Sequence, residues 1–417
     1  VTAANDAPVN TVPGVQTTAQ DTPLVFTINN GTDITLSDAD AGSNELEVTL
    51  SVDNGTLTVN STVAEGGETL VNTSTTGTQS EPDVAYAADG SYVVIWQDSN
   101  SLDGDLWGIF GQRFDASGNK VGGEFLVNTA TANNQTDAAI AMDDAGNFVV
   151  TWVHRTNGGS TEIYAQRFDA SATKLGGDFT VNTTSQFNQK LGDIAMNATG
   201  EFVISWYDNG PGDDEGVFFQ RYDAAGNEVG SETLVNTTIT DNQQMPRLAM
   251  DDAGNFVVVW QSNLQDGSGL GIYGQRYDAT GTAQGGEFLI NTTTANSQTN
   301  PSVSMDATGN FVVVWESNLQ DGSGLGIYGQ RYDSAGNAQG SEFQINETTA
   351  SNQQQTNVAM TATGEFVVVW ASYGSDGNDY ATMARRYDAA GNPISGELVV
   401  NTTTTGAQWD PDLAIKD

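Results

Sequence analysis

One spacing governs what this chain can fold into: an Asn and a Gln seven residues apart recur seven times between residues 72 and 408. A Trp follows six of these Gln residues at a distance of 17, and an Arg follows each Trp after 15 to 17 residues. From each Arg to the next Asn is always 15 residues, so only the stretch between Trp and Arg varies in length. This periodicity predicts about seven copies of one supersecondary unit of about 55 residues. The recurring aromatic and basic residues are Trp96, Trp152, Trp206, Trp260, Trp315 and Trp370, and Arg113, Arg167, Arg221, Arg276, Arg331 and Arg386.

Each unit is expected to form four antiparallel strands, which the fifth copy illustrates. Its two short turns carry Asp at the first and Gly at the fourth position, a pattern typical of type I turns. The run Phe311–Trp315 is apolar throughout and suits a strand that is buried on both faces. Four-stranded sheets repeated radially predict an all-β fold, a β-propeller of about seven blades. The alternative is a linear β-solenoid, whose coils are usually shorter and less bulky. The expected strands are 301–305, 310–315, 327–332 and 342–346.

Only six units are complete in the linear sequence, so closure of the ring has to use both ends of the chain. Pro411–Ile415 is predicted to supply the innermost strand of the seventh blade. The stretches 45–52, 56–60 and 68–72 are predicted to supply its other three strands, with Asp53-Asn-Gly55 as a hairpin turn. The predicted domains are therefore an extended segment at 1–44 and a propeller at 45–417, with repeat units that begin near residues 66, 122, 176, 230, 285, 340 and 395.

The charge of the chain excludes several classes of partner. Its formal net charge is −40, so nucleic acid and anionic membrane surfaces are repelled. No apolar stretch is long enough to predict membrane insertion. The chain has no cysteine, which excludes disulfides and thiolate chemistry.

Cations are the natural counter-species of such a chain, and calcium is the possible cofactor. Asp38 and Asp40 alternate before Gly42, a local geometry that hard cations favour. Asp103 and Asp105, in a loop between Trp and Arg, are a weaker candidate pair. The other acidic residues of these loops, Asp213, Asp214, Asp266 and Asp321, are expected to be solvated turn residues. None of these segments matches a complete EF-hand calcium loop.

The recurring residues themselves are expected to be structural. Each Trp ends an apolar run and is predicted to pack in the core, while Trp107, outside the repeat, is a candidate for exposed contact. The repeated Asn and Gln are predicted to bind backbone groups of the connection between blades. Each Arg is predicted to pair across strands with the acidic residue that opens the outermost strand. Those acidic residues are Glu124, Asp178, Glu232, Glu287, Glu342 and Glu397.

No recognisable catalytic motif is present. The single histidine, His154, has no cysteine partner, and no zinc-protease, P-loop or nucleophile-elbow pattern occurs. The units also look alike, whereas enzymatic propellers break their symmetry with unique acids, bases or arginines at one pole. The sequence therefore predicts a protein that is not an enzyme.

Two segments resemble known families. Units such as Gly254–Ser262 followed by Asp266–Asp278 resemble repeats of large secreted bacterial proteins, which often also carry cadherin-like or RTX calcium-binding modules. This resemblance covers residues 66–417. The stretch from Asn5 to Leu57 resembles the opening half of a cadherin-like adhesin domain, although it ends short of a complete one. The resemblance implies export and an extracellular or cell-surface location, and it implies no established reaction.

These observations together predict an extracellular structural or adhesive protein of a bacterial surface or matrix. Self-association into filaments is predicted through Leu24, Val25, Phe26, Thr27 and Ile28, which can add a strand to the edge of a neighbouring copy. A lectin-like propeller that binds surface or matrix polysaccharide is the first alternative. A glycoside hydrolase is the second.

Overall fold

The computed structural model of the protein describes residues 9–11, 35–37, 68–100, 103–156, 158–184, 188–208 and 215–416. The chain divides into two compact units, Val1–Ser61 and Thr62–Asp417. In the first unit the described strands β1 (Val9–Thr11) and β2 (Thr35–Ser37) pair antiparallel, with Asn10 opposite Leu36. The sequence predicted a boundary at residue 44. Within the described ranges, no helix is long and apolar enough to span a membrane.

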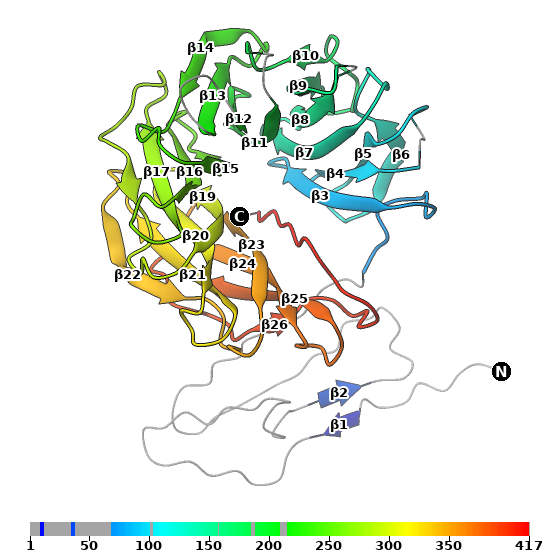
Figure 1. Ribbon diagram of the computed structural model, residues 1–417. Helices are drawn as coiled ribbons and strands as arrows, with labels where there is room; N and C mark the ends of the chain where they lie inside the picture. The colour runs from blue at the N-terminus through cyan, green and yellow to red at the C-terminus, as the bar shows by residue number, and fades with distance from the viewer. Residues whose placement is uncertain are drawn as a thin grey trace, which may run out of the picture. The chain divides into compact units, whose positions relative to one another are not determined.

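The second unit is an all-β propeller, and its described residues form six four-stranded antiparallel blades (Figure 1). Within each blade the strands follow one another in chain order, as predicted. The innermost and second strands are β3 (Gln79–Tyr86) and β4 (Tyr92–Asp98), β7 (Gln135–Met142) and β8 (Phe148–Arg155), β11 (Gln189–Met196) and β12 (Phe202–Asp208), β15 (Gln243–Met250) and β16 (Phe256–Asn263), β19 (Gln298–Met305) and β20 (Phe311–Asn318), and β23 (Gln353–Met360) and β24 (Phe366–Tyr373). The third and outermost strands are β5 (Gly108–Phe114) and β6 (Lys120–Leu126), β9 (Thr161–Phe168) and β10 (Phe179–Thr180), β13 (Gly216–Tyr222) and β14 (Glu228–Leu234), β17 (Leu270–Tyr277) and β18 (Phe288–Leu289), β21 (Leu325–Tyr332) and β22 (Ala338–Gln344), and β25 (Tyr380–Tyr387) and β26 (Leu398–Val399).

The second strand of each blade is packed on both faces, which explains its apolar run. In β16, Val258 and Trp260 contact a cluster that includes Phe219 of the preceding blade. Val257 and Val259, which point the other way, join a cluster with Phe311 of the following blade. All six repeat Trp residues are buried, and five of them belong to clusters shared by neighbouring blades.

The repeated Asn and Gln organise the connection between blades, as predicted. In the first connection the Asn128 Oδ1 accepts a hydrogen bond from the Ile109 amide at 2.9 Å, and its Nδ2 donates to the Ala130 carbonyl at 3.0 Å. The Gln135 Nε2 donates to the Ala132 carbonyl at 3.0 Å. The same contacts recur at Asn236, Asn291 and Asn346. The long turn therefore satisfies its buried backbone groups internally.

An acidic residue in the outermost strand, or directly before it, binds backbone amides of each connection, and we call this contact the clasp. The Glu232 carboxylate accepts a hydrogen bond from the Thr183 amide at 2.8 Å, and Glu342 accepts one from Thr292 at 2.6 Å. This clasp recurs seven times along the chain. In the seventh, Glu68 binds the amides of Thr402 and Thr403, which joins residues from opposite ends of the propeller unit.

The C-terminal segment takes the seventh inner position. It runs from blade β23–β26 toward the centre of the propeller, where the chain ends beside β3 (Figure 1). Asp412 accepts a hydrogen bond from the Val84 amide of β3 at 2.9 Å and one from the Asn357 side chain of β23. About seven blades were predicted, and the described residues form six four-stranded blades followed by an inner segment in the place of a seventh; the stretches 411–415 and 68–72, predicted as strands of that blade, are not strands. The stretches predicted as the second and third strands of that blade, 45–52 and 56–60, lie outside the described residues.

Replacing the closing acid, Glu68→Ala, is expected to lower the melting temperature by a few degrees more than Glu232→Ala does. Both variants remove the same clasp, but the blades beside Glu232 are already joined by the chain, whereas Glu68 links segments that only folding brings together. Hydrogen bonds from Thr403 and Thr402 lower the Glu68 pKa to about 2. Its contribution is therefore present above the ordinary carboxyl pKa and is lost as the pH falls toward 2. Equal melting temperatures for the two variants at neutral pH would contradict this role.

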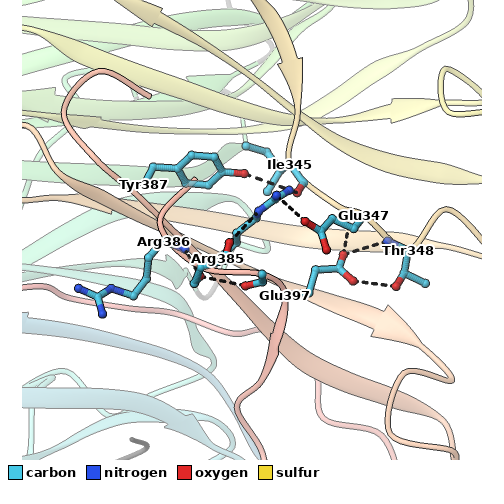
Figure 2. A network of polar contacts seen from close by, with 9 residues as sticks. Ile345, Glu347, Thr348, Arg385, Arg386, Tyr387 and Glu397 are labelled. Atoms are coloured by element: carbon cyan, nitrogen blue, oxygen red, sulfur yellow. Dashed lines mark hydrogen bonds and ion pairs between the residues drawn. The ribbon is translucent and has the colours of Figure 1, made fainter. Parts of the chain in front are cut away.

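The repeated arginines differ from their predicted partners. Among the described ion pairs none joins a repeated arginine to the acidic residue of its own blade; instead four of the six donate hydrogen bonds to the turn between the third and outermost strands of the following blade. The Arg167 guanidinium donates to the Ala224 carbonyl at 3.0 Å, and that of Arg331 donates to the Ala389 carbonyl at 2.7 Å. In the last blade Glu397 binds Thr348, and the Arg386 guanidinium extends away from it (Figure 2). The carboxylates predicted to pair with the arginines instead accept hydrogen bonds from backbone amides of the connections.

Candidate active site at the propeller axis

The inner strands carry a bulge at their third residue. In five of the described inner strands, and in the C-terminal segment, this residue has a φ between 51° and 55°. In each inner strand the pairing register with its neighbour shifts between the second and the fifth residue. A left-handed residue other than glycine is strained, and such bulges re-aim side chains at functional sites. These third residues are Glu81, Asp137, Met245, Asn300, Gln355 and Asp410.

The residue after each buried Trp holds the bulge of the following blade in three cases. The Gln97 side-chain oxygen accepts a hydrogen bond from the Asp137 amide at 3.1 Å. Gln261 does the same for Asn300 at 3.1 Å, and Glu316 for Gln355 at 2.6 Å. In the second, third and sixth blades the corresponding residues are Val153, Tyr207 and Ala371. The pattern is therefore broken at three of the six described blades, of which the second and third are neighbours.

A cavity of about 400 Å³ lies where this pattern is broken at the second and third blades. We call it the axial cavity. Val153 and Tyr207 contribute to its wall, and Asp137 and Met245 bring the third residues of β7 and β15 to it. Its lining residues are Asn134, Thr136, Asp137, Val153, Arg155, Thr161, Gln189, Lys190, Tyr207 and Met245.

Two third-residue carboxyl groups, those of Asp137 and Asp410, lie close enough to Glu81 to raise its pKa, and we call Glu81, Asp137 and Asp410 the axial carboxylates. Burial raises the pKa of Glu81, repulsion by Asp410 and Asp137 raises it further, and Arg247 opposes the change. Burial also raises the pKa of Asp137, against a hydrogen bond from Thr136, and that of Asp410, against one from Gln355. Glu81 nevertheless remains exposed to solvent. Like charges in one site favour retention of a proton among them.

The fifth residues of the inner strands form a second polar layer along the axis. The Asp83 carboxylate accepts a hydrogen bond from the Ile140 amide of the next blade at 2.9 Å, and Asp193 accepts one from the Leu248 amide at 2.7 Å. Asp412 continues this pattern with Val84. Burial raises the pKa of all three aspartates, that of Asp193 to about 6. Since these carboxylates bind the edge amides of inner strands, we assign this layer to ring structure.

The axial carboxylates offer the chemistry of a glycosidase. A carboxyl group with a raised pKa can donate its proton to a leaving oxygen, and an ionised neighbour can stabilise positive charge or take up a proton. Tyr207, whose pKa burial and the nearby Glu215 and Asp137 raise to about 12, stays protonated at the cavity wall. The arrangement therefore joins an acid, a carboxylate and a cavity in one place.

The predicted metal-binding acids have other partners where they are described. The Asp103 carboxylate accepts hydrogen bonds from the Asp105 amide and from the Asn128 side chain, each at 3.2 Å, and Asp105 accepts one from the Asn133 amide at 2.8 Å. Asp321 plays the same role toward Asn346. Among the described residues no group of three or more His, Cys, Asp or Glu is arranged to hold a metal ion. Calcium binding at Asp38 and Asp40 stays a prediction, because these residues, Asp213 and Asp214 lie outside the described ranges.

The remaining predicted contact residues lie apart from the axial carboxylates. Trp107 is half-buried and its carbonyl accepts a hydrogen bond from the Gln135 amide at 3.0 Å. His154 is buried, with its ring against Tyr164 and its Nδ1 3.2 Å from the Gln135 Nε2. The predicted self-association strand, Leu24–Ile28, lies outside the described residues.

No protein-family model matches the chain, and no characterised protein matches it by sequence. Among solved structures it is similar to a Penicillium chrysogenum α-L-arabinanase complexed with arabinobiose, at 13% identity and a TM-score of 0.51, over 73% of this chain and 92% of the other. It is also similar to the GH93 α-L-arabinofuranosidase of Fusarium graminearum (13%, TM-score 0.49, 73% and 92%) and to a Hadza microbial sialidase (10%, TM-score 0.46, 70% and 63%). At these identities the likeness shows the propeller fold.

These comparisons correct the predicted function. A non-catalytic structural or adhesive module that forms filaments was expected, and the similar solved structures are glycoside-hydrolase and sialidase propellers. The premise that the units are alike at both poles was also wrong, because the third and fifth residues of the inner strands differ from blade to blade. The signal was present in the sequence at fixed distances of two and four residues after each repeated Gln. The resemblance to RTX and cadherin-like proteins stays a resemblance.

Proposed function

We propose that the protein hydrolyses glycosidic bonds at the axial site, with Glu81 as the proton donor and Asp137 as the ionised carboxylate that faces the substrate. The observation that carries this proposal is Asp137 in the lining of the axial cavity, with Glu81 near enough for Asp137 to raise its pKa. The fold shared with an arabinanase crystallised with arabinobiose supports a saccharide as the class of substrate. An extracellular site of action, predicted from the sequence, is compatible with this reaction and stays a prediction.

The roles follow from exposure and neighbours. Glu81 is exposed and has two carboxylates near it, so it can hold a proton and deliver it to a bound substrate. Asp137 lines the cavity, and Thr136 donates a hydrogen bond to its carboxylate at 3.1 Å, which favours the ionised form. In the reaction the glycosidic C–O bond breaks and the leaving oxygen takes the proton of Glu81. Water supplies hydroxyl to the anomeric carbon and returns a proton to the carboxyl pair.

The test is the release of reducing ends from a panel of polysaccharides, including arabinan, and of aryl glycosides by the full chain. Asp137→Asn is expected to lower the rate roughly 100- to 10,000-fold, the usual range for one acid–base group. Asp144→Asn, an exposed turn residue of the same blade, is the matched control and should keep full activity. Hydrolysis of no substrate in the panel, or equal rates for Asp137→Asn and the wild type, would overturn the proposal.

A further inference from the structure

The few basic residues of this chain are distributed unequally between structural and axial positions. Against 53 acidic residues the chain has 13 Lys and Arg. The six repeated arginines belong to the repeated blade structure, and four of them donate hydrogen bonds to turn carbonyls. Three of the others, Arg155, Lys190 and Arg247, belong to neighbouring blades and meet around the axial site. Arg155 and Lys190 line the axial cavity, and Arg247 acts electrostatically on Glu81 and Tyr207.

These three cations differ in how far the fold already uses them. The Lys190 Nζ forms an ion pair with Glu215 and lies 5.3 Å from the ring centroid of Tyr207. The Arg247 guanidinium donates to the Pro246 carbonyl at 3.2 Å. Arg155, at the end of β8, has an exposed side chain, while its backbone pairs with Thr161 of β9 and its amide donates to the Asn134 carbonyl at 2.9 Å. The described residues give its guanidinium no acidic partner within ion-pair distance.

We propose that the axial cavity binds an anionic sugar unit, through Arg155 as the principal contact and Lys190 as the second. This inference rests on the proposed function and names its substrate class: a glycan whose units carry a carboxylate or a sulfate. A strongly acidic protein repels an anion unless cationic side chains neutralise the negative potential at the binding site. A guanidinium binds a carboxylate or sulfate by two parallel hydrogen bonds, which a neutral sugar does not require. Tyr207, protonated and partly beneath Lys190, adds an apolar face for the sugar ring.

The experiment compares matched ligands on the full chain. A uronic-acid oligosaccharide, the same oligosaccharide with its carboxyl groups reduced to alcohols, and a sulfated neutral oligosaccharide are titrated by calorimetry, and their kcat/KM values are measured. The carboxylated or the sulfated ligand is expected to bind about 10-fold or more tightly than the reduced one, the effect of one charge-assisted contact. Arg155→Gln should abolish this preference, mainly through KM. Lys120→Gln, which removes an exposed cation on β6, changes the net charge equally and should preserve it.

The outcomes separate this inference from the proposed function. Arg155-dependent binding of anionic ligands without any hydrolysis would support the anion site and overturn the hydrolase. Hydrolysis of neutral glycans that depends on Asp137 and is unaffected by Arg155→Gln would support the hydrolase and overturn the anion site. A preference for the sulfated over the carboxylated ligand that is lost in Arg155→Gln supports the site and assigns sulfate as the group. Equal affinity for charged and reduced ligands overturns the inference.

Discussion

Removal of Asp410–Asp417 is expected to lower the melting temperature of the propeller by about 10 °C. The segment closes the ring between β23 and β3 without a covalent link. Its loss removes the acceptors of the Asn357 and Gln355 side-chain amides, and the Val84 amide keeps only its hydrogen bond to Asp83. Each unsatisfied buried group costs about 1–3 kcal/mol, which sums to several kcal/mol for a fold whose total stability is marginal.

The measurement is thermal unfolding followed by circular dichroism, with calorimetry to establish whether one transition remains. A chain that ends at Ile415 is the matched control, because it loses two residues and keeps Asp410 and Asp412. It should melt close to the wild type. If both truncated chains melt with the wild type, the C-terminal segment does not close the ring.

The same segment gives the stability of the ring a defined pH dependence. Burial raises the pKa values of Asp83 and Asp412, which share a hydrogen bond; repulsion by Asp412 adds to the change at Asp83, and repulsion by Asp193 adds to that at Asp412. Carboxyl groups whose folded pKa is raised stabilise the fold while they are protonated, and this contribution is lost as the pH rises through the raised pKa. The melting difference between the wild type and the chain truncated after Trp409 should therefore be larger at mildly acidic than at mildly alkaline pH. The sign is opposite to that expected for the Glu68 clasp.

The repeated spacing predicts the blades because the residues that recur are those with structural roles. The Trp residues, the repeated Asn and Gln and the closing role of Pro411–Ile415 all concern packing and backbone satisfaction, which each blade must solve in the same way. The arginines were assigned the wrong partners for a related reason. Opposite charges on neighbouring strands predicted pairs such as Arg331 with Glu342, but the Glu342 carboxylate binds the Thr292 amide of an earlier connection. The spacing of residues within one blade does not reveal the contacts that those residues make with neighbouring blades.

The axial site could not be found by the same reasoning, because it consists of residues that do not recur. Asp137, Met245 and Asn300 occupy one structural position and have different side-chain chemistry. Their common left-handed conformation is not signalled by glycine, so the bulge that brings them to the axis is invisible in the sequence. The axial cavity also lies beside Val153 and Tyr207, which replace the Gln or Glu that binds the next bulge in three other blades. Comparison of the units for their differences would have placed Glu81, Asp137 and Arg247 together.

Glu81→Gln is expected to lower kcat for the hydrolysis of unactivated glycans by roughly 100- to 10,000-fold and to leave KM nearly unchanged. Glutamine keeps the size of the side chain and cannot transfer a proton. Because the pKa of Glu81 is raised, the wild-type enzyme should retain its protonated donor at a higher pH than an ordinary glutamate would, and activity should decline as the pH rises through that value. This alkaline limb should be absent from the residual activity of Glu81→Gln.

Two further variants make the assignment to Glu81 specific. Arg247 lowers the pKa of Glu81, so Arg247→Gln should move the alkaline limb to higher pH while the chemistry persists. Glu228→Gln, an exposed substitution on the outermost strand β14, should leave both kcat and the pH profile unchanged. Aryl glycosides with good leaving groups need less help from an acid, so Glu81→Gln should harm their hydrolysis far less than that of polysaccharides. An equal loss on both kinds of substrate, with the alkaline limb retained, would show that Glu81 is not the proton donor.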